Sequence, residues 1–147
     1  MNELPAAVHE SIERLCSAGD ELAERQSYKD AIARYNEAWL LIPAPQTEWE
    51  ASTWVLAAIG DACFLGGFFQ SGLDALQHAM HCPSGVGNPF IHLRLGQCAL
   101  EKGLDAMAAE HLARAYMLEG KEIFAEDDPK YFAFLKTKIA PPVSGEW

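Results

Sequence analysis

The chain has 147 residues, of which 50% are hydrophobic and 10% aromatic. This length fits a single domain, and the composition is too apolar for a disordered chain. Uncharged apolar runs such as residues 62–73 are shorter than the roughly 18 to 20 residues of a membrane-spanning helix. The formal net charge of −10 opposes binding to nucleic acid or to an anionic membrane surface.

The first residues contain neither a basic leader nor an apolar stretch, and the acidic residues Glu10 and Glu13 follow closely. They do not resemble a signal peptide, so we expect a cytoplasmic protein. The cysteines lie far apart in apolar surroundings, with no C-x-x-C pair, which predicts buried reduced thiols and no disulfides. These cysteines are Cys16, Cys63, Cys82 and Cys98.

Three successive segments carry the same pattern of small and large residues. In each, a glycine is followed 12 residues later by a small residue and then, four residues further on, by a large one. The equivalent triplets are Gly19, Ala31 and Tyr35, then Gly60, Gly72 and Leu76, then Gly96, Ala108 and Leu112. Such a pattern is typical of helix pairs, because small residues allow two helices to cross closely and a large one fills the space beside them.

These residues resemble the tetratricopeptide repeat (TPR) family over about residues 12 to 116. The family's 34-residue unit is an antiparallel helix pair, whereas the glycines here are spaced by 41 and then 36 residues. The resemblance implies an all-α fold in one domain, 1–147. We expect a TPR-like α-α superhelix of three helix pairs, at about 12–45, 47–83 and 88–118, plus a C-terminal capping helix at 129–139.

The helix boundaries have recognisable signals. Extra residues fall around 45–50, where Thr47 and Glu50 have the spacing of a capping box that would start a long helix. Asn88 precedes Pro89, which predicts an N-cap followed by proline at the first helical position. The apolar residues expected to seal the end of the stack are Tyr131, Phe132, Phe134 and Leu135.

In TPR folds the first helices of successive repeats line a concave groove that holds peptides or partner helices. The resemblance therefore assigns candidate partner-binding residues by register. They are Glu13, Ser17, Asp20 and Glu24 in the first unit, Trp54, Ala58, Asp61 and Leu65 in the second, and Phe90, Arg94, Gln97 and Glu101 in the third. This surface is acidic at one end and apolar in the middle, which suits a basic or apolar protein segment. Trp54 and Phe90 could equally pack against neighbouring helices.

Other chemistry is poorly supported by the residues. TPR domains that grip an acidic peptide need lysine and asparagine where this chain has Cys16 and Asp20, and Asp20 would repel such a peptide. His78, His81 and Cys82 share one helical face, but three side chains from one helix rarely surround zinc. The acidic run 126–128 is interpreted as a solvated helix start. We expect no metal, no cofactor and no enzymatic activity, since Cys63 and Cys98 sit at packing positions and no catalytic motif is present.

The sequence therefore predicts a non-enzymatic protein–protein interaction module that acts as an adaptor or a chaperone. Its partner would be another protein or peptide of basic or apolar character, with no role for nucleic acid or membrane. An alternative remains open, because the acidity and compactness are similar to those of bacterial immunity proteins, which neutralise basic toxins by direct binding.

Overall fold

The computed structural model describes residues 3–147 and contains no strand within that range. Its α-helices are α1 (Ala6–Glu24), α2 (Tyr28–Leu41), α3 (Glu50–Gly66), α4 (Phe69–Ala79), α5 (Pro89–Glu101), α6 (Asp105–Glu119) and α7 (Lys130–Lys136), and its 3-10 helices are η1 (Gln46–Glu48) and η2 (Lys121–Phe124). Every helix in residues 3–147 is too short or too polar to cross a lipid bilayer. The predicted all-α fold is confirmed.

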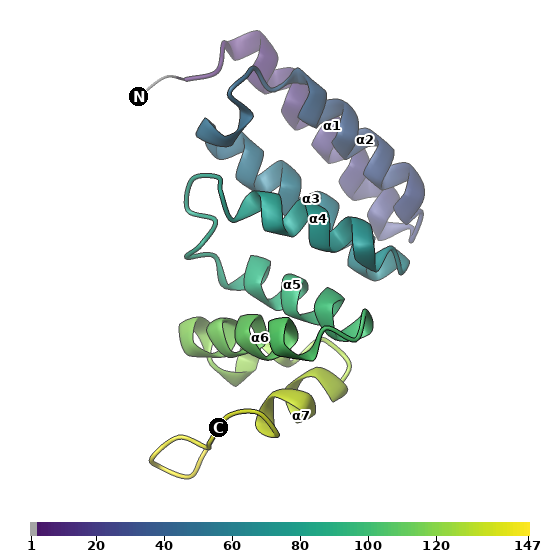
Figure 1. Cartoon of the computed structure of the whole chain (residues 1–147). Helices are drawn as coiled ribbons and strands as arrows, with labels where there is room; N and C mark the ends of the chain where they lie inside the picture. Colours follow the sequence, from purple (N-terminus) through teal and green to yellow (C-terminus); the bar gives the residue numbers. More distant parts are fainter. Residues whose placement is uncertain (1–2) are drawn as a thin grey trace.

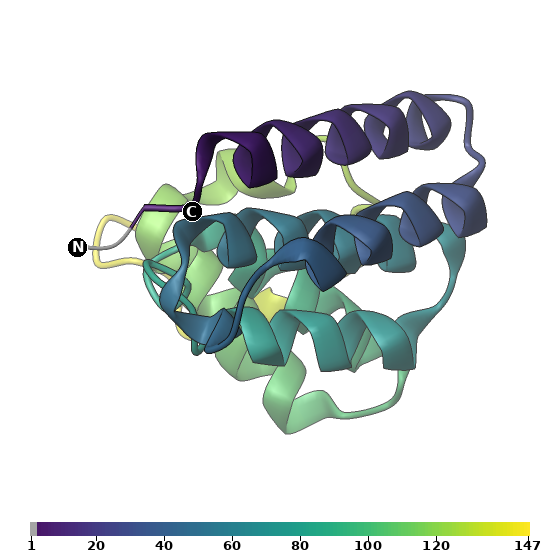
Figure 2. The same cartoon turned by 90° about the horizontal axis from the view of Figure 1, so that it is seen from above.

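The helices form three antiparallel pairs stacked one on another (Figure 1). Helix α1 pairs with α2, α3 with α4 and α5 with α6, while α2 packs on α3 and α4 packs on α5. Figure 2, which looks along the stack, shows the helices of the first two pairs running side by side. This arrangement is the predicted TPR-like superhelix, with α1, α3 and α5 as the first helices of its pairs.

The C-terminal segment closes the last pair. Helix α7 corresponds to the helix expected at 129–139, and it packs against α6 and η2. Leu135 is fully buried there, and Phe132 stacks on Phe124 with ring centroids 5.0 Å apart. Apolar rings therefore cover a helix face that would otherwise meet water.

The repeated glycines are required by close helix crossings. In each pair the glycine of the first helix lies against the large residue of the second helix. A Cβ atom at Gly96 would lie only 2.7 Å from Cγ of Leu112 and 3.0 Å from the Leu112 backbone nitrogen. Because Leu112 is fully buried, it has no space into which to move.

The two helix starts expected from the sequence have different outcomes. The Asn88 side chain accepts hydrogen bonds from the backbone N–H groups of Phe90 and Ile91, with Pro89 at the first position, as predicted. The Thr47–Glu50 capping box is wrong. Thr47 lies in η1 and Glu50 is the first residue of α3, so the residue at the N-cap is Trp49. The Trp49 side chain makes no capping hydrogen bond, and its indole instead donates a 2.9 Å hydrogen bond to the carbonyl of Pro43.

All four cysteines are free and buried, as the sequence predicts. Burial raises the pKa of the Cys16 and Cys63 thiols to about 11 and that of Cys98 to about 12, and it also raises the pKa of Cys82. The thiols are therefore protonated near neutral pH and act as small packing groups.

A histidine pair, with His92 fully buried and His111 partly buried, joins α5 to α6. His92 Nε2 lies 2.6 Å from the carbonyl oxygen of Val86, and His92 Nδ1 lies 3.0 Å from Nδ1 of His111. A carbonyl can only accept, so Nε2 of His92 donates to Val86. Burial, together with the neighbouring His92, lowers the pKa of His111 to about 4.

Replacing Gly96 with alanine tests the close crossing of α5 and α6. We expect Gly96→Ala to lower the free energy of unfolding by about 1–3 kcal/mol, because the added methyl group overpacks the contact with Leu112. Gly87→Ala is the matched control, since a Cβ there meets no atom within 4 Å, and it should change stability by less than about 0.5 kcal/mol. Urea unfolding followed by circular dichroism measures both, and equal effects would contradict the steric explanation.

The histidine pair predicts a loss of stability in mild acid. His111 has its ordinary pKa of 6.5 when unfolded and a pKa of about 4 when folded, so the unfolded state binds more protons between these values. The contribution of His111 to the free energy of unfolding is therefore fully present above its unfolded pKa of 6.5, and it is lost as the pH falls towards its folded pKa of about 4. From about pH 7.5 to about pH 5, wild type should lose about 2 kcal/mol more than His111→Leu. A His111 imidazole that titrates at its ordinary pKa in an NMR titration would refute this.

Candidate partner-binding site

The predicted binding residues differ in exposure along the first helices of the stack. The exposed ones lie on α1 and α3, whereas the buried ones lie on α5. Exposed residues are Glu13, Ser17, Asp20, Glu24, Trp54 and Leu65, partly buried ones are Ala58, Asp61, Phe90 and Glu101, and buried ones are Arg94 and Gln97. The predicted row is thus exposed at its N-terminal end and largely buried at its C-terminal end.

Helix α1 contributes exposed carboxylates at that open end. The hydroxyl of Tyr35 donates a 2.6 Å hydrogen bond to Asp20, and burial followed by this bond raises the Tyr35 pKa. Glu13 is paired with His9, one helical turn earlier. These contacts hold two of the acidic side chains in place, which suits them to receive a cationic group.

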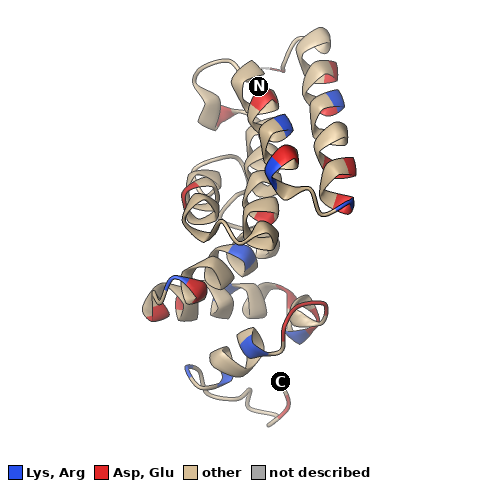
Figure 3. Ribbon diagram, turned by 90° about the vertical axis from the view of Figure 1, so that its right-hand side faces the viewer, with Lys and Arg blue, Asp and Glu red and all other residues tan. Residues whose placement is uncertain are grey.

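Helix α3 contributes an apolar surface beside these carboxylates. Trp54 is 38% exposed and Leu65 is 45% exposed, with Ala58 between them. Charged residues are sparse in the second pair, as the mostly tan ribbon in the middle of Figure 3 shows. Trp54 is therefore exposed, whereas the Phe90 ring packs beneath the guanidinium of Arg94.

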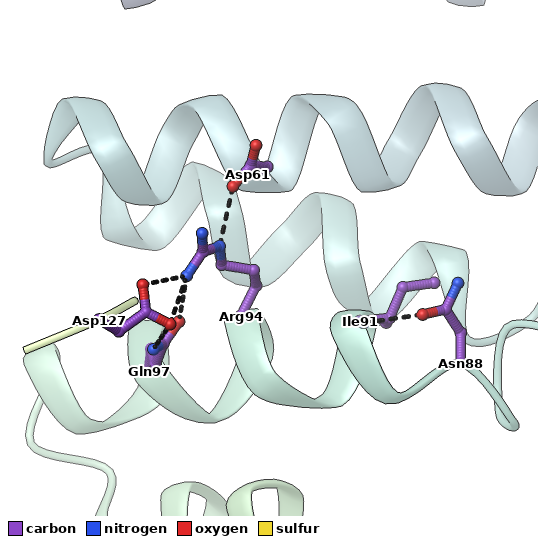
Figure 4. Close-up of polar contacts among 6 residues, drawn as sticks. All are labelled: Asp61, Asn88, Ile91, Arg94, Gln97 and Asp127. Atoms are coloured by element: carbon purple, nitrogen blue, oxygen red, sulfur yellow. Dashed lines mark hydrogen bonds and ion pairs between the residues drawn. The ribbon is translucent and has the colours of Figure 1, made fainter. Parts of the chain in front are cut away.

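Arg94, whose guanidinium lies over the Phe90 ring, is the centre of a polar cluster (Figure 4). Arg94 Nε donates to Asp61 at 2.8 Å, and its Nη1 donates to Gln97 at 2.8 Å and to both carboxylate oxygens of Asp127 at 3.1 and 3.2 Å. Gln97 in turn donates to Asp127 at 3.0 Å. The cluster joins α3, α5 and the segment that leads into α7.

Aromatic rings enclose the same guanidinium. Its central carbon lies 4.7 Å from the ring centroid of Phe64 and 4.9 Å from that of Phe90. The Arg94 side chain is only 10% exposed, and that of Asp127 only 15%. A charge removed from water to this degree requires its carboxylate partners, because an unpaired buried ion is strongly destabilising.

The chain's own C-terminal segment also contacts the predicted binding residues of α5. Glu101 is 2.9 Å from the ammonium of Lys130, and the Tyr131 hydroxyl donates to Glu101 at 3.3 Å. The ring of Tyr131 also lies against Phe64, with centroids 5.8 Å apart. Arg94, Gln97 and Glu101 are thus engaged within the molecule, and their contact with a partner stays a prediction.

Sequence reasoning missed the role of Asp127. The interpretation of 126–128 as a solvated helix start is wrong for Asp127, which is largely buried against Arg94. It fits Asp128, whose carboxylate accepts a 2.9 Å hydrogen bond from the backbone N–H of Lys130. No local pattern distinguishes the two aspartates, since the partner of Asp127 is 33 residues away.

No protein-family model matches this sequence, and no curated protein matches it significantly. The fold is nevertheless similar to solved structures of SycD, the type III secretion translocator chaperone of Yersinia enterocolitica. One is an alternative dimer of SycD, and the other is SycD in complex with a peptide of the translocator YopD. Each SycD structure has a TM-score of 0.69 and 18% sequence identity to this protein. In both comparisons the similarity covers 92% of this chain and 95% of the SycD chain. This similarity establishes an all-helical, TPR-like fold.

The Arg94 cluster predicts unequal costs for removing surface and buried ion pairs. Arg94→Met should lower the free energy of unfolding by about 3–5 kcal/mol, because it leaves two carboxylates without their partner. Asp127→Asn should cost about 1–3 kcal/mol. Arg114→Met serves as control, since Arg114 is half exposed and 3.8 Å from Glu110, and it should cost less than about 1 kcal/mol. Similar losses for all three variants in urea unfolding would contradict this assignment.

Proposed function

We propose that this chain is a non-enzymatic, chaperone-like module that holds a segment of another protein along α1 and α3. The observation that carries the proposal is the row of exposed carboxylates on α1 next to exposed Trp54 and Leu65 on α3. An extended segment can place apolar side chains on the α3 surface while its basic groups face α1.

The similarity to SycD supports this choice on architectural grounds. SycD has been solved with a peptide of the translocator YopD, so a stack of this shape is compatible with peptide binding. The closed α5 end directs the proposed site to α1 and α3, because its side chains already bind the C-terminal segment.

Absence of catalysis is part of the same proposal. A cysteine–histidine nucleophile requires a thiolate, whereas the four thiols are buried and their pKa values are raised. The imidazoles of His92 and His111 bond to each other rather than to a thiol.

A basic or apolar segment is the proposed partner. The net charge of −10 and the carboxylates on α1 oppose an acidic segment. A role as an immunity protein would use the same charge, but no contact or surface of the structure favours a toxin over an extended segment. The chaperone-like role is therefore the one we put forward.

Selection of peptides from a random library on the immobilised protein tests the proposal. We expect the selected peptides to be rich in apolar and basic residues. Ala58→Arg should weaken their binding at least about tenfold in isothermal titration calorimetry, because it places a bulky cation in the groove. Met117→Arg is the matched control, because Met117 lies on α6 and is 81% exposed, and this variant should bind within about twofold of wild type. Acidic selected peptides, or equal effects of the two variants, would refute the proposed groove.

A further inference from the structure

A cavity lies at the N-terminal end of the groove, between the beginnings of α1 and α3. Its volume is about 580 Å³, which is in the range of cavities that bind small ligands. His9 lies one turn before Glu13 on α1, and Trp54 belongs to the predicted row on α3, so the cavity continues the groove. Its chemically distinctive lining residues are Glu3, His9, Glu48, Trp49, Glu50 and Trp54.

Indole rings form a firm wall of this cavity. Trp49 is fixed by its 2.9 Å hydrogen bond to the carbonyl of Pro43. Trp54 contacts the ring of His9 edge to face, with centroids 6.3 Å apart and an angle of 83° between the planes. Exposed indole surface in a fixed position attracts cations through the negative face of the ring system.

Carboxylates without partners surround the same indoles. Glu3, Glu48 and Glu50 are exposed, and across residues 3–147 none of them takes part in an ion pair or a side-chain hydrogen bond. Within residues 3–147, no lysine or arginine lines the cavity. The basic residue among these lining residues is His9, which is already paired with Glu13. The cavity therefore combines unneutralised negative charge with aromatic surface.

We propose that this cavity binds an arginine side chain of the protein segment held in the groove. A planar guanidinium stacks on an indole and donates several hydrogen bonds to carboxylates at once, whereas a lysine ammonium does neither as well. The identification of the arginine's source rests on the proposed function. Binding of this arginine at the N-terminal end of the groove would fix the position of the whole segment relative to the apolar surface of α3.

NMR titration with the probe acetyl-Gly-Arg-Gly-amide tests the cavity without any partner protein. The indole N–H signals of Trp49 and Trp54, which both line the cavity, should shift with saturable, weak binding. In Trp54→Ala the remaining Trp49 signal should no longer saturate. The matched probe acetyl-Gly-norleucine-Gly-amide has the same length without the charge and should bind at least about fivefold more weakly. Equal binding of the two probes would overturn the proposal, as would tighter binding of acetyl-Gly-Lys-Gly-amide.

A pair of charge variants separates the cavity from general electrostatics. The double variant Glu48→Gln with Glu50→Gln should weaken binding of the arginine probe at least about fivefold. The control, Glu119→Gln with Glu126→Gln, changes the net charge equally at two exposed sites outside the cavity and should stay within about twofold. Equal weakening by both double variants would overturn the site.

The two proposals can fail separately. Binding of the arginine probe at Trp54 together with no selected peptides would reject the proposed function and keep the cavity as a guanidinium site. Selected peptides that respond to Ala58→Arg but not to the double variant Glu48→Gln with Glu50→Gln would reject the cavity and keep the groove.

Discussion

The structure depends most on the burial of one positive charge. Arg94 lies between two phenylalanine rings and binds Asp61, Gln97 and Asp127. A guanidinium in such surroundings is stable only with its carboxylates in place. Because those carboxylates come from α3 and from the segment before α7, neutralising the charge also fixes the C-terminal segment against the groove.

This constraint makes the two ends of the predicted row of binding residues unequal. At the α5 end the chain's own aspartate, lysine and tyrosine occupy positions that the repeat pattern assigns to a partner. At the α1 end the corresponding carboxylates remain exposed. The insertion around residues 45–50, which breaks the regular repeat spacing, supplies Trp49 and two glutamates to the cavity. An irregularity in the repeat thus coincides with the most distinctive surface of the molecule.

The packing of the stack itself uses simpler interactions. Glycine opposite a large residue recurs in each pair, and the thiols fill small spaces between helices. The imidazoles of His92 and His111 are an exception, because they place a titratable contact between α5 and α6. The last pair and its cap therefore contain most of the buried polar contacts, whereas the first two pairs rely mainly on shape.

The sequence by itself determined the all-helical fold, the three pairs, the Asn88 cap and the buried thiols, because each follows from residue spacing within a few helical turns. It also marked Trp54 and Leu65 as members of one row. Only the tertiary structure decided that Arg94 is enclosed and that Asp127 is its partner. It also decided that Trp49, rather than Thr47, precedes α3 and lines the cavity. Those outcomes join residues many positions apart, or depend on where one ring packs, and no periodic pattern records such contacts.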